Sequence, residues 1–199
     1  MIAAIKSSVL AVLALAMTVL CALAAQAADR YVIDGAHSDL VFMVNHLGYS
    51  MTIGRMNRVE GEILFDESRV ENSSVEIAID AASLDTNHRA RDDDLRSANF
   101  FNVERYPRIT FKSTAVEATG ENTGRVTGDL TLLAVTRPVT LEVTFNRKAP
   151  HPIPSYDGVI TAGFSARTRI KRSDFGMDAY VPAVGDEVEL LIEIEAFQQ

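Results

Sequence analysis

The sequence predicts an all-β protein, an antiparallel sheet folded into a sandwich or a barrel. Apolar and polar residues alternate along many short segments, which is typical of strands with one buried face. Turn-forming runs such as Glu71-Asn72-Ser73-Ser74 separate these segments. The sequence also offers one clear helix candidate, whereas a parallel sheet needs a helical crossover between successive strands. The alternation alone leaves the choice between sandwich and barrel open.

The chain begins with the three parts of an export leader. Lys6 precedes an uncharged run over residues 7–25, and Ala25-Gln26-Ala27 supplies a small-x-small cleavage pattern. The run is 19 residues long, so a retained membrane anchor is the rival interpretation. Its high alanine content and the cleavage pattern favour removal. We therefore expect residues 1–27 to be a signal peptide, residues 28–199 to form one domain, and the mature protein to lie in the periplasm.

Removal of the leader changes the chemistry that the chain can offer. The 199-residue precursor has 19 basic and 27 acidic residues. Cleavage after Ala27 removes 27 residues, of which Lys6 is the only charged one, and leaves 172 residues with a formal net charge of −9. An acidic exported protein is a poor candidate for nucleic-acid binding. Cys21 is the only cysteine and leaves with the leader, so the mature protein has no disulfide and no thiol nucleophile.

The predicted strands follow one another with few interruptions after the leader. Long segments such as 52–66 and 159–171 favour a barrel, because strands must tilt and curl to close one. One face of each segment is mainly Val, Ile, Leu and Phe, which suits either a packed core or an apolar cavity. The expected strands cover residues 40–45, 52–66, 75–80, 109–113, 125–132, 139–145, 159–171 and 188–195.

A single short helix is predicted over residues 87–97, with Thr86 or Asn87 as its N-cap. Three successive aspartates, Asp92 to Asp94, lie within this segment. Successive residues of a helix point in different directions, so these carboxylates do not converge on a cation. Their negative charges near the N-terminus of the helix instead interact favourably with the helix dipole. Three arginines of the segment are expected to pair with them along the helix, rather than to bind an anionic headgroup: Arg89, Arg91 and Arg96.

Motifs of common enzyme classes are missing from the sequence. It contains no G-x-S-x-G, Walker loop, H-E-x-x-H or dinucleotide fingerprint. Four histidines could act as bases or ligands, namely His37, His46, His88 and His151. His37 and His46 flank the first predicted strand and could join a metal site. We favour the simpler interpretation, polar residues at a barrel rim or in a turn, and predict no catalytic residue, no metal and no cofactor.

Strings spread over almost the whole mature length make the chain resemble the YceI-like family, exported bacterial proteins associated with polyisoprenoid binding. Each string is weak alone, but their order and spacing together are specific. Ala134 departs from the pattern, which has glycine before Val-Thr, and we expect this to alter a turn. The strings include Tyr31-Val32-Ile33-Asp34, Phe42-x-Val44-x-His46-x-Gly48, Gly61-x-Ile63-x-Phe65-Asp66, Tyr106-Pro107-x-Ile109-Thr110-Phe111 and Arg172-Ser173-Asp174-Phe175-Gly176-Met177.

The resemblance implies a lipocalin-like antiparallel barrel of about eight strands whose interior holds a long isoprenoid, quinone-like or fatty-amide chain. The inward faces would then line a lipid cavity rather than a packed core. Ser38, His46 and Arg91 are the expected polar residues of its mouth. The expected lining residues are Phe42, Val44, Phe65, Ile77, Phe111, Leu130, Leu132, Leu141, Val143, Phe164 and Ile192.

The function expected from this fold is that of a lipid carrier or buffer, which exchanges its ligand by transient contact with a membrane. Two alternatives stay open at this point. One is an accessory to a membrane electron-transfer system, with a quinone as the ligand. The other is an enzyme that modifies the lipid through His37 or His46. The sequence also leaves a homodimer open.

Overall fold

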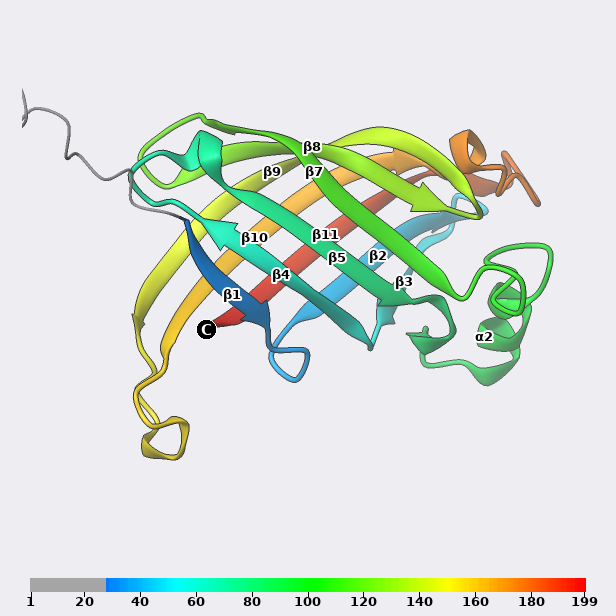
Figure 1. Cartoon of the computed structure of the whole chain (residues 1–199). Helices are drawn as coiled ribbons and strands as arrows, with labels where there is room; N and C mark the ends of the chain where they lie inside the picture. The colour runs from blue at the N-terminus through cyan, green and yellow to red at the C-terminus, as the bar shows by residue number, and fades with distance from the viewer. Residues whose placement is uncertain (1–27) are drawn as a thin grey trace, which may run out of the picture.

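The computed structural model describes residues 28–199, so the predicted leader, residues 1–27, lies outside the described residues. Within residues 28–199, eleven strands form one antiparallel sheet (Figure 1). The strands are β1 (Asp29–Ile33), β2 (Asp39–His46), β3 (Ser50–Met56), β4 (Val59–Phe65), β5 (Ser74–Asp80), β6 (Leu84–Asp85), β7 (Arg108–Ala118), β8 (Thr123–Leu132), β9 (Val135–Pro150), β10 (Ile160–Lys171) and β11 (Val184–Gln198).

The sheet closes into a barrel. Strands β1, β4, β5, β7, β8, β9, β10 and β11 form the ring in this order, and β1 pairs with both β4 and β11. Strand β11 is long enough to pair with two strands along one edge, β1 near its C-terminal end and β2 along the rest. Strands β3 and β6 extend the sheet beyond β2. The closed ring of eight strands confirms the predicted fold class and decides for the barrel over the sandwich.

The alternation of the sequence corresponds to the two faces of the barrel wall. Leu130 and Leu132 on β8 are buried in the interior with Ile192 and Ile194 on β11, while the residues between them are more exposed. Two large aromatic side chains face glycines on the neighbouring strand. A Cβ atom on Gly54 would collide with the ring of Phe42, and one on Gly128 would collide with the ring of Phe111. These glycines therefore let the two rings lie flat against the inner wall.

The predicted strand over residues 52–66 was wrong as one element, because β3 ends at Met56 and β4 begins at Val59. Both residues are buried, although their odd separation would put them on opposite faces of one continuous strand. The backbone turns between them, where the amide groups of Asn57 and Arg58 donate hydrogen bonds to Ser83.

The predicted helix is present as α2 (Arg89–Arg96), slightly shorter than the expected 87–97. Its N-cap is His88 rather than Thr86 or Asn87, since the ring nitrogen Nδ1 of His88 accepts a hydrogen bond from the amide of Arg91 at 3.2 Å. Short 3-10 turns supply the other helical segments within residues 28–199, at Val70–Asn72, Ala81–Ser83, Pro154–Tyr156 (η3) and Arg172–Phe175 (η4). No helix in this part of the chain is long and apolar enough to cross a membrane.

The turn between β8 and β9 holds Ala134 in a backbone conformation that suits glycine. Leu133 and Ala134 have φ values of 52° and 62°, and Leu132 pairs with Val135 across the turn. Left-handed backbone costs a residue with a Cβ atom roughly 1–2 kcal/mol. We expect Ala134→Gly to raise the free energy of unfolding by about 1 kcal/mol, measured by urea denaturation.

The matched control is Ala78→Gly on β5, where φ is not positive. Glycine in a strand interior costs roughly 0.5–1 kcal/mol, so this variant is expected to lose stability. Equal losses for both variants would contradict the strain assigned to Ala134.

Candidate functional site

The barrel encloses two apolar cavities that adjoin. The first, cavity 1, has a volume of about 430 Å³ and lies toward α2, whose residues Arg91 and Leu95 form part of its wall. The second, cavity 2, has a volume of about 400 Å³ and lies between β4, β5, β8, β9 and β10, with the β7–β8 turn at its end. Each volume is within the range of small-molecule binding sites. Four residues line both cavities and form a waist between them: Ile77, Leu141, Ile192 and Ile194.

All eleven residues expected to line a lipid cavity lie on these inner walls. Phe42, Val44, Phe111, Leu130 and Leu132 line cavity 1, and Ile77, Leu141 and Ile192 lie at the waist. Three more line cavity 2, where the rings of Phe65 and Phe164 meet edge to face with centroids 5.3 Å apart: Phe65, Val143 and Phe164. Contact of these residues with a lipid remains a prediction.

The expected polar mouth is only partly assembled. His46 and Arg91 both line cavity 1, beside Asp94. The guanidinium of Arg91 is already engaged, because its Nε and Nη2 atoms donate to the hydroxyl and carbonyl oxygens of Thr86 at 2.7 Å each. Arg91 therefore fixes α2 against the loop that precedes it and has fewer donors left for a ligand.

Ser38 was wrongly placed at the mouth. Its hydroxyl donates to the carbonyl oxygen of Glu195 at 3.3 Å and accepts from the amide of Glu195 at 3.2 Å. Ser38 lies in the loop between β1 and β2, at the point where β11 changes from one partner strand to the other. Its side chain thus satisfies backbone groups at this seam, and it is not among the residues that line either cavity.

A buried carboxylate anchors the helix at the mouth. Asp92 accepts hydrogen bonds from the hydroxyl and the amide of Thr86, at 2.5 and 2.9 Å. Burial alone would raise the pKa of Asp92, but the hydrogen bonds from Thr86 and the nearby charges of Arg96 and Arg91 keep it below its usual value. Asp92 is therefore a structural group with a partner within the loop, and not a free acid directed at the cavity.

The expected pairing of arginines and aspartates along α2 holds for two of the three arginines. Asp93 lies 3.9 Å from Arg89 and 3.7 Å from Arg96. Arg91 pairs with Thr86 instead. Such exposed ion pairs contribute little to stability. The helix α2 is therefore held in place mainly by Asp92 and Arg91, which bind Thr86, and by Arg96, which donates to the carbonyl oxygens of Ala82 and Leu84.

The other histidines fit structural roles. His37 lies on the surface, where Nδ1 is 2.6 Å from the Asp34 carboxylate, and this contact raises the pKa of His37. The ring of His151 stacks on that of Tyr156, with centroids 3.8 Å apart. Within residues 28–199, no three His, Cys, Asp or Glu side chains lie close enough together to hold a metal ion.

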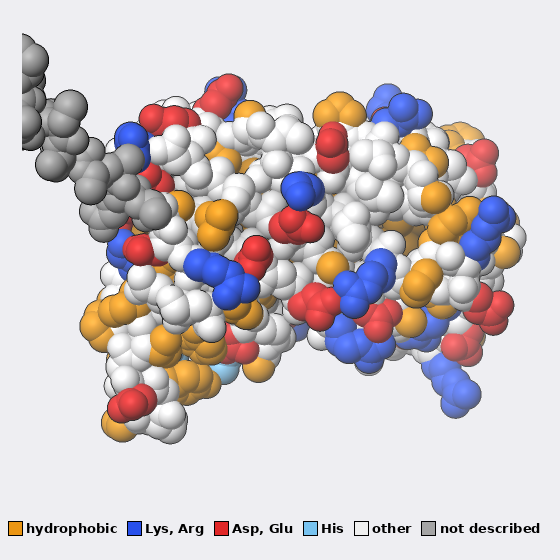
Figure 2. All heavy atoms as spheres, viewed as in Figure 1, with side chains coloured by type: hydrophobic (Ala, Val, Ile, Leu, Met, Phe, Trp, Pro, Cys, Tyr) orange, Lys and Arg blue, Asp and Glu red, His pale blue; other side chains and the backbone are white. Residues whose placement is uncertain are grey.

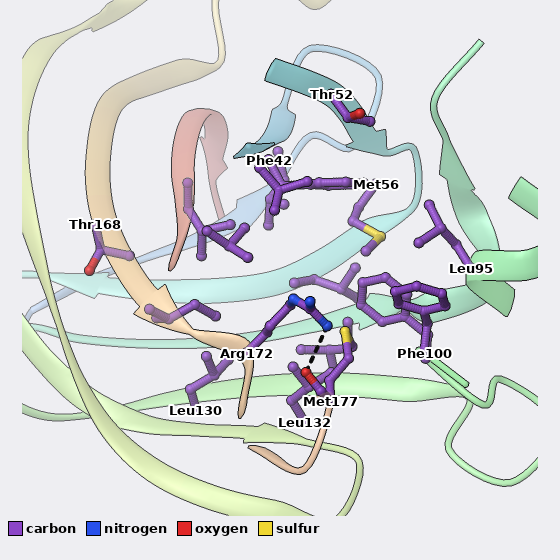
Figure 3. Close-up of a pocket in the computed structure, with 18 of the residues that line it drawn as sticks. Phe42, Thr52, Met56, Leu95, Phe100, Leu130, Leu132, Thr168, Arg172 and Met177 are labelled. Atoms are coloured by element: carbon purple, nitrogen blue, oxygen red, sulfur yellow. Dashed lines mark hydrogen bonds between the residues drawn. The ribbon is translucent and has the colours of Figure 1, made fainter. Parts of the chain in front are cut away.

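Sequence reasoning missed Arg172, a buried cation in the wall of cavity 1. Only 3% of this residue is exposed, and its guanidinium points among the apolar side chains of the pocket (Figure 3). Four backbone carbonyl oxygens accept its hydrogen bonds at 2.8–3.0 Å: those of Met177, Ala179, Val184 and Gly185. Burial lowers the pKa of Arg172, because desolvation disfavours its charged form.

The strand pattern contained a signal for this residue. Phe164 and Ile170 mark the inward parity of β10, and position 172 has the same parity. An arginine on an inward position at the end of a strand indicates a buried role for the side chain. Here the hydrogen bonds of Arg172 stabilise the connection that leads from η4 into β11. This connection forms part of the cavity mouth, because its residues Tyr180 and Ala183 line cavity 1.

The fold and the interior define a class of protein: a closed antiparallel, lipocalin-like barrel whose inner wall encloses apolar cavities. The YceI-like domain model matches residues 31–196. A UPF0312 protein of Azotobacter vinelandii is 40% identical over 192 residues, which cover 96% of this chain and 97% of that protein. The chain belongs to the YceI-like family.

Solved structures share the barrel. BcnA of Burkholderia cenocepacia is similar with a TM-score of 0.74 and 26% identity, covering 82% of this chain and 98% of that one. A polyisoprenoid-binding domain from Saccharophagus degradans has a TM-score of 0.66 at 16% identity, covering 85% of this chain and 98% of the domain. At that identity the likeness shows the fold alone.

Proposed function

We propose that this protein binds one long apolar lipid of the isoprenoid type in its two adjoining cavities, and that it carries or buffers this lipid in the periplasm without chemical change. The observation that carries the proposal is the inner wall itself. Aliphatic and aromatic side chains from nine strands, β2 to β5 and β7 to β11, line the two cavities, with a few polar groups near the ends. The Saccharophagus domain supports it, because a barrel of the same fold is described there as polyisoprenoid-binding.

The shape of the interior favours a chain over a compact ligand. The two cavities adjoin at the waist formed by Ile77, Leu141, Ile192 and Ile194, so a ligand that occupies both must extend past these four side chains. Isoprenoid alcohols, quinone tails and fatty amides are all long chains of this kind. A hydrocarbon slot distinguishes weakly between chains of similar girth, so the polar end of the lipid sets the choice among them.

Energetics favour carriage over permanent storage. Each buried methylene group is worth about 0.8 kcal/mol relative to water, which would make a long chain bind almost irreversibly from water. The alternative location of such a lipid is a membrane, where its methylene groups are already out of water. Transfer between membrane and barrel is then close to balance, as a carrier or buffer requires.

The test of this function is the effect of lipid on melting. A ligand that binds only the folded state stabilises it by mass action, by about 2.7 kcal/mol when its free concentration is a hundred times Kd. For a domain of this size, that corresponds to a rise in Tm of roughly 5–10 °C. We expect this rise when the delipidated protein takes up a long-chain prenol, measured by calorimetry. Identical melting with and without the prenol would refute the proposal.

A further inference from the structure

Exposed apolar side chains gather around the opening of cavity 1. Within residues 28–199, seven large apolar residues are exposed, and six of them lie on two short segments. One segment is the β2–β3 hairpin and the other is the connection between η4 and β11. We call these six residues the rim: Leu47, Tyr49, Met51, Ile53, Tyr180 and Val181.

The two segments of the rim are neighbours in space. The amide of Leu47 donates a hydrogen bond to the carbonyl oxygen of Ala183 at 2.9 Å, and His46 pairs with Val184. Leu47 and Tyr180 also line cavity 1, so the rim continues directly into the apolar interior. Scattered apolar residues on a surface need no explanation, but a group that borders a cavity opening indicates an interaction site.

The charges around the rim suit a membrane surface. Residues 46–58 and 179–185 contain no Asp or Glu, in a chain that has 27 of them. Arg55 on the outer side of β3 pairs with Asp39 at 3.0 Å, which leaves this part of the surface close to neutral. Arg89, at the start of α2 beside the mouth, has a side chain that is 95% exposed. The two rim segments therefore carry no acidic side chain of their own in an otherwise acidic protein, so they add no repulsion from an anionic lipid surface, and Asp94 is the acidic residue that lines cavity 1.

We propose that the rim is a membrane-docking surface that places the opening of cavity 1 against a lipid bilayer. Leu47, Met51 and Ile53 enter the boundary between headgroups and acyl chains, while Tyr49 and Tyr180 lie at headgroup level, where amphipathic rings are favoured. Docking in this orientation lets a lipid pass from bilayer to barrel without crossing water. This inference rests on the proposed function and adds the route by which the ligand enters.

A bilayer explains the rim better than a second copy of the chain. Leu47 and Tyr180 of the rim line cavity 1, so a partner chain seated on the rim would lie against the route by which an apolar ligand enters. Hydrophobic side chains also gather over the β9–β10 connection at the lower left of Figure 2, where Ile153 is exposed. That group lies at the other end of the barrel from α2 (Figure 1), away from cavity 1, and provides a matched control.

The chain has no tryptophan, so a single introduced tryptophan can report on docking. The probe is Tyr49→Trp, at a residue that is 89% exposed and does not line cavity 1, and the control is Ile153→Trp. The test uses vesicles of phosphatidylethanolamine with a minority of phosphatidylglycerol and with brominated acyl chains. We expect a blue shift and quenching for Tyr49→Trp only. An equal response, or no response, from both variants would overturn the proposal.

A second pair of variants measures the energy of docking. Ile53 and Ile153 are 55% and 53% exposed, so Ile53→Glu and Ile153→Glu change surfaces of similar accessibility. Loss of one inserted isoleucine is expected to weaken vesicle binding of Ile53→Glu about tenfold in a flotation assay. Ile153→Glu should bind like the wild type.

Two further outcomes separate the alternatives. If the wild type is a dimer in sedimentation, Ile53→Glu is a monomer and vesicle binding is unchanged, the rim is an interface between two copies and the docking inference fails. Extraction of lipid from the purified wild type gives the other distinction. If the wild-type protein retains lipid but does not bind vesicles, the docking inference fails and the proposed function stands. If the purified wild-type protein contains no lipid, the proposed function itself fails.

Discussion

Replacement of Arg172 by methionine is expected to lower the free energy of unfolding by about 3–5 kcal/mol, because it leaves buried backbone groups without donors. The arginine satisfies four carbonyl oxygens on the connection that leads into β11. Methionine fills a similar volume but donates no hydrogen bond. Urea denaturation measures the loss, and faster amide exchange over residues 177–185 would locate it.

Arg167 provides the control for this substitution. It lies on the same strand, β10, but is exposed, and Arg167→Met is expected to change stability by less than about 0.5 kcal/mol. Arg172→Lys keeps the charge but cannot reach all four oxygens, so it should fall between the wild type and the methionine variant. A loss below about 1 kcal/mol for Arg172→Met would show that the connection is held by other contacts.

Substitution of Leu141 by tryptophan is expected to lower lipid affinity about tenfold or more. Leu141 lies at the waist, and a larger ring there takes space from both cavities. If the ring keeps two methylene groups of the lipid out of the cavity, at about 0.8 kcal/mol each, the lipid affinity falls about tenfold. The delipidated variant should melt close to the wild type, because the ring enters space that is unfilled without ligand. Titration with a long-chain prenol measures the affinity.

Thr144→Trp places the same side chain on the outer face of β9 and is the matched control. Its lipid affinity should equal that of the wild type. A different pattern would contradict the cavity: if Leu141→Trp strongly destabilises the delipidated protein, the ring has no room, and the interior is a close-packed core.

The alternation of side chains predicted most of the barrel wall, since burial on one face forces a period of two. It did not predict β1, because this strand has only five residues and two inward side chains, Tyr31 and Ile33. Yet β1 is the strand that closes the ring. Closure depends on pairing between strands that are distant in sequence, such as Ile33 with Ala196, and a local pattern carries no information about it.

The interior could be predicted as a set of residues but not as a cavity. Phe111 and Leu132 would face inward in either a packed core or an open one, because the width of the barrel depends on strand number and tilt. The mouth was harder still. Ser38 satisfies backbone groups at a seam that only the pairing of β11 creates, and the donors of Arg91 are taken up by Thr86. Arg172 directly follows β10 and continues the inward parity of that strand, so its burial was predictable on that ground.

The central claim is that one lipid molecule fills the barrel, and native mass spectrometry of the protein purified from its export compartment tests it most directly. We expect the mass of the protein to exceed that of the chain starting at Ala28 by the mass of one long-chain lipid, and organic extraction should remove this excess. The released molecule should be of the isoprenoid type. A protein that carries no lipid, and whose mass is unchanged by extraction, would contradict the claim that a lipid fills the barrel.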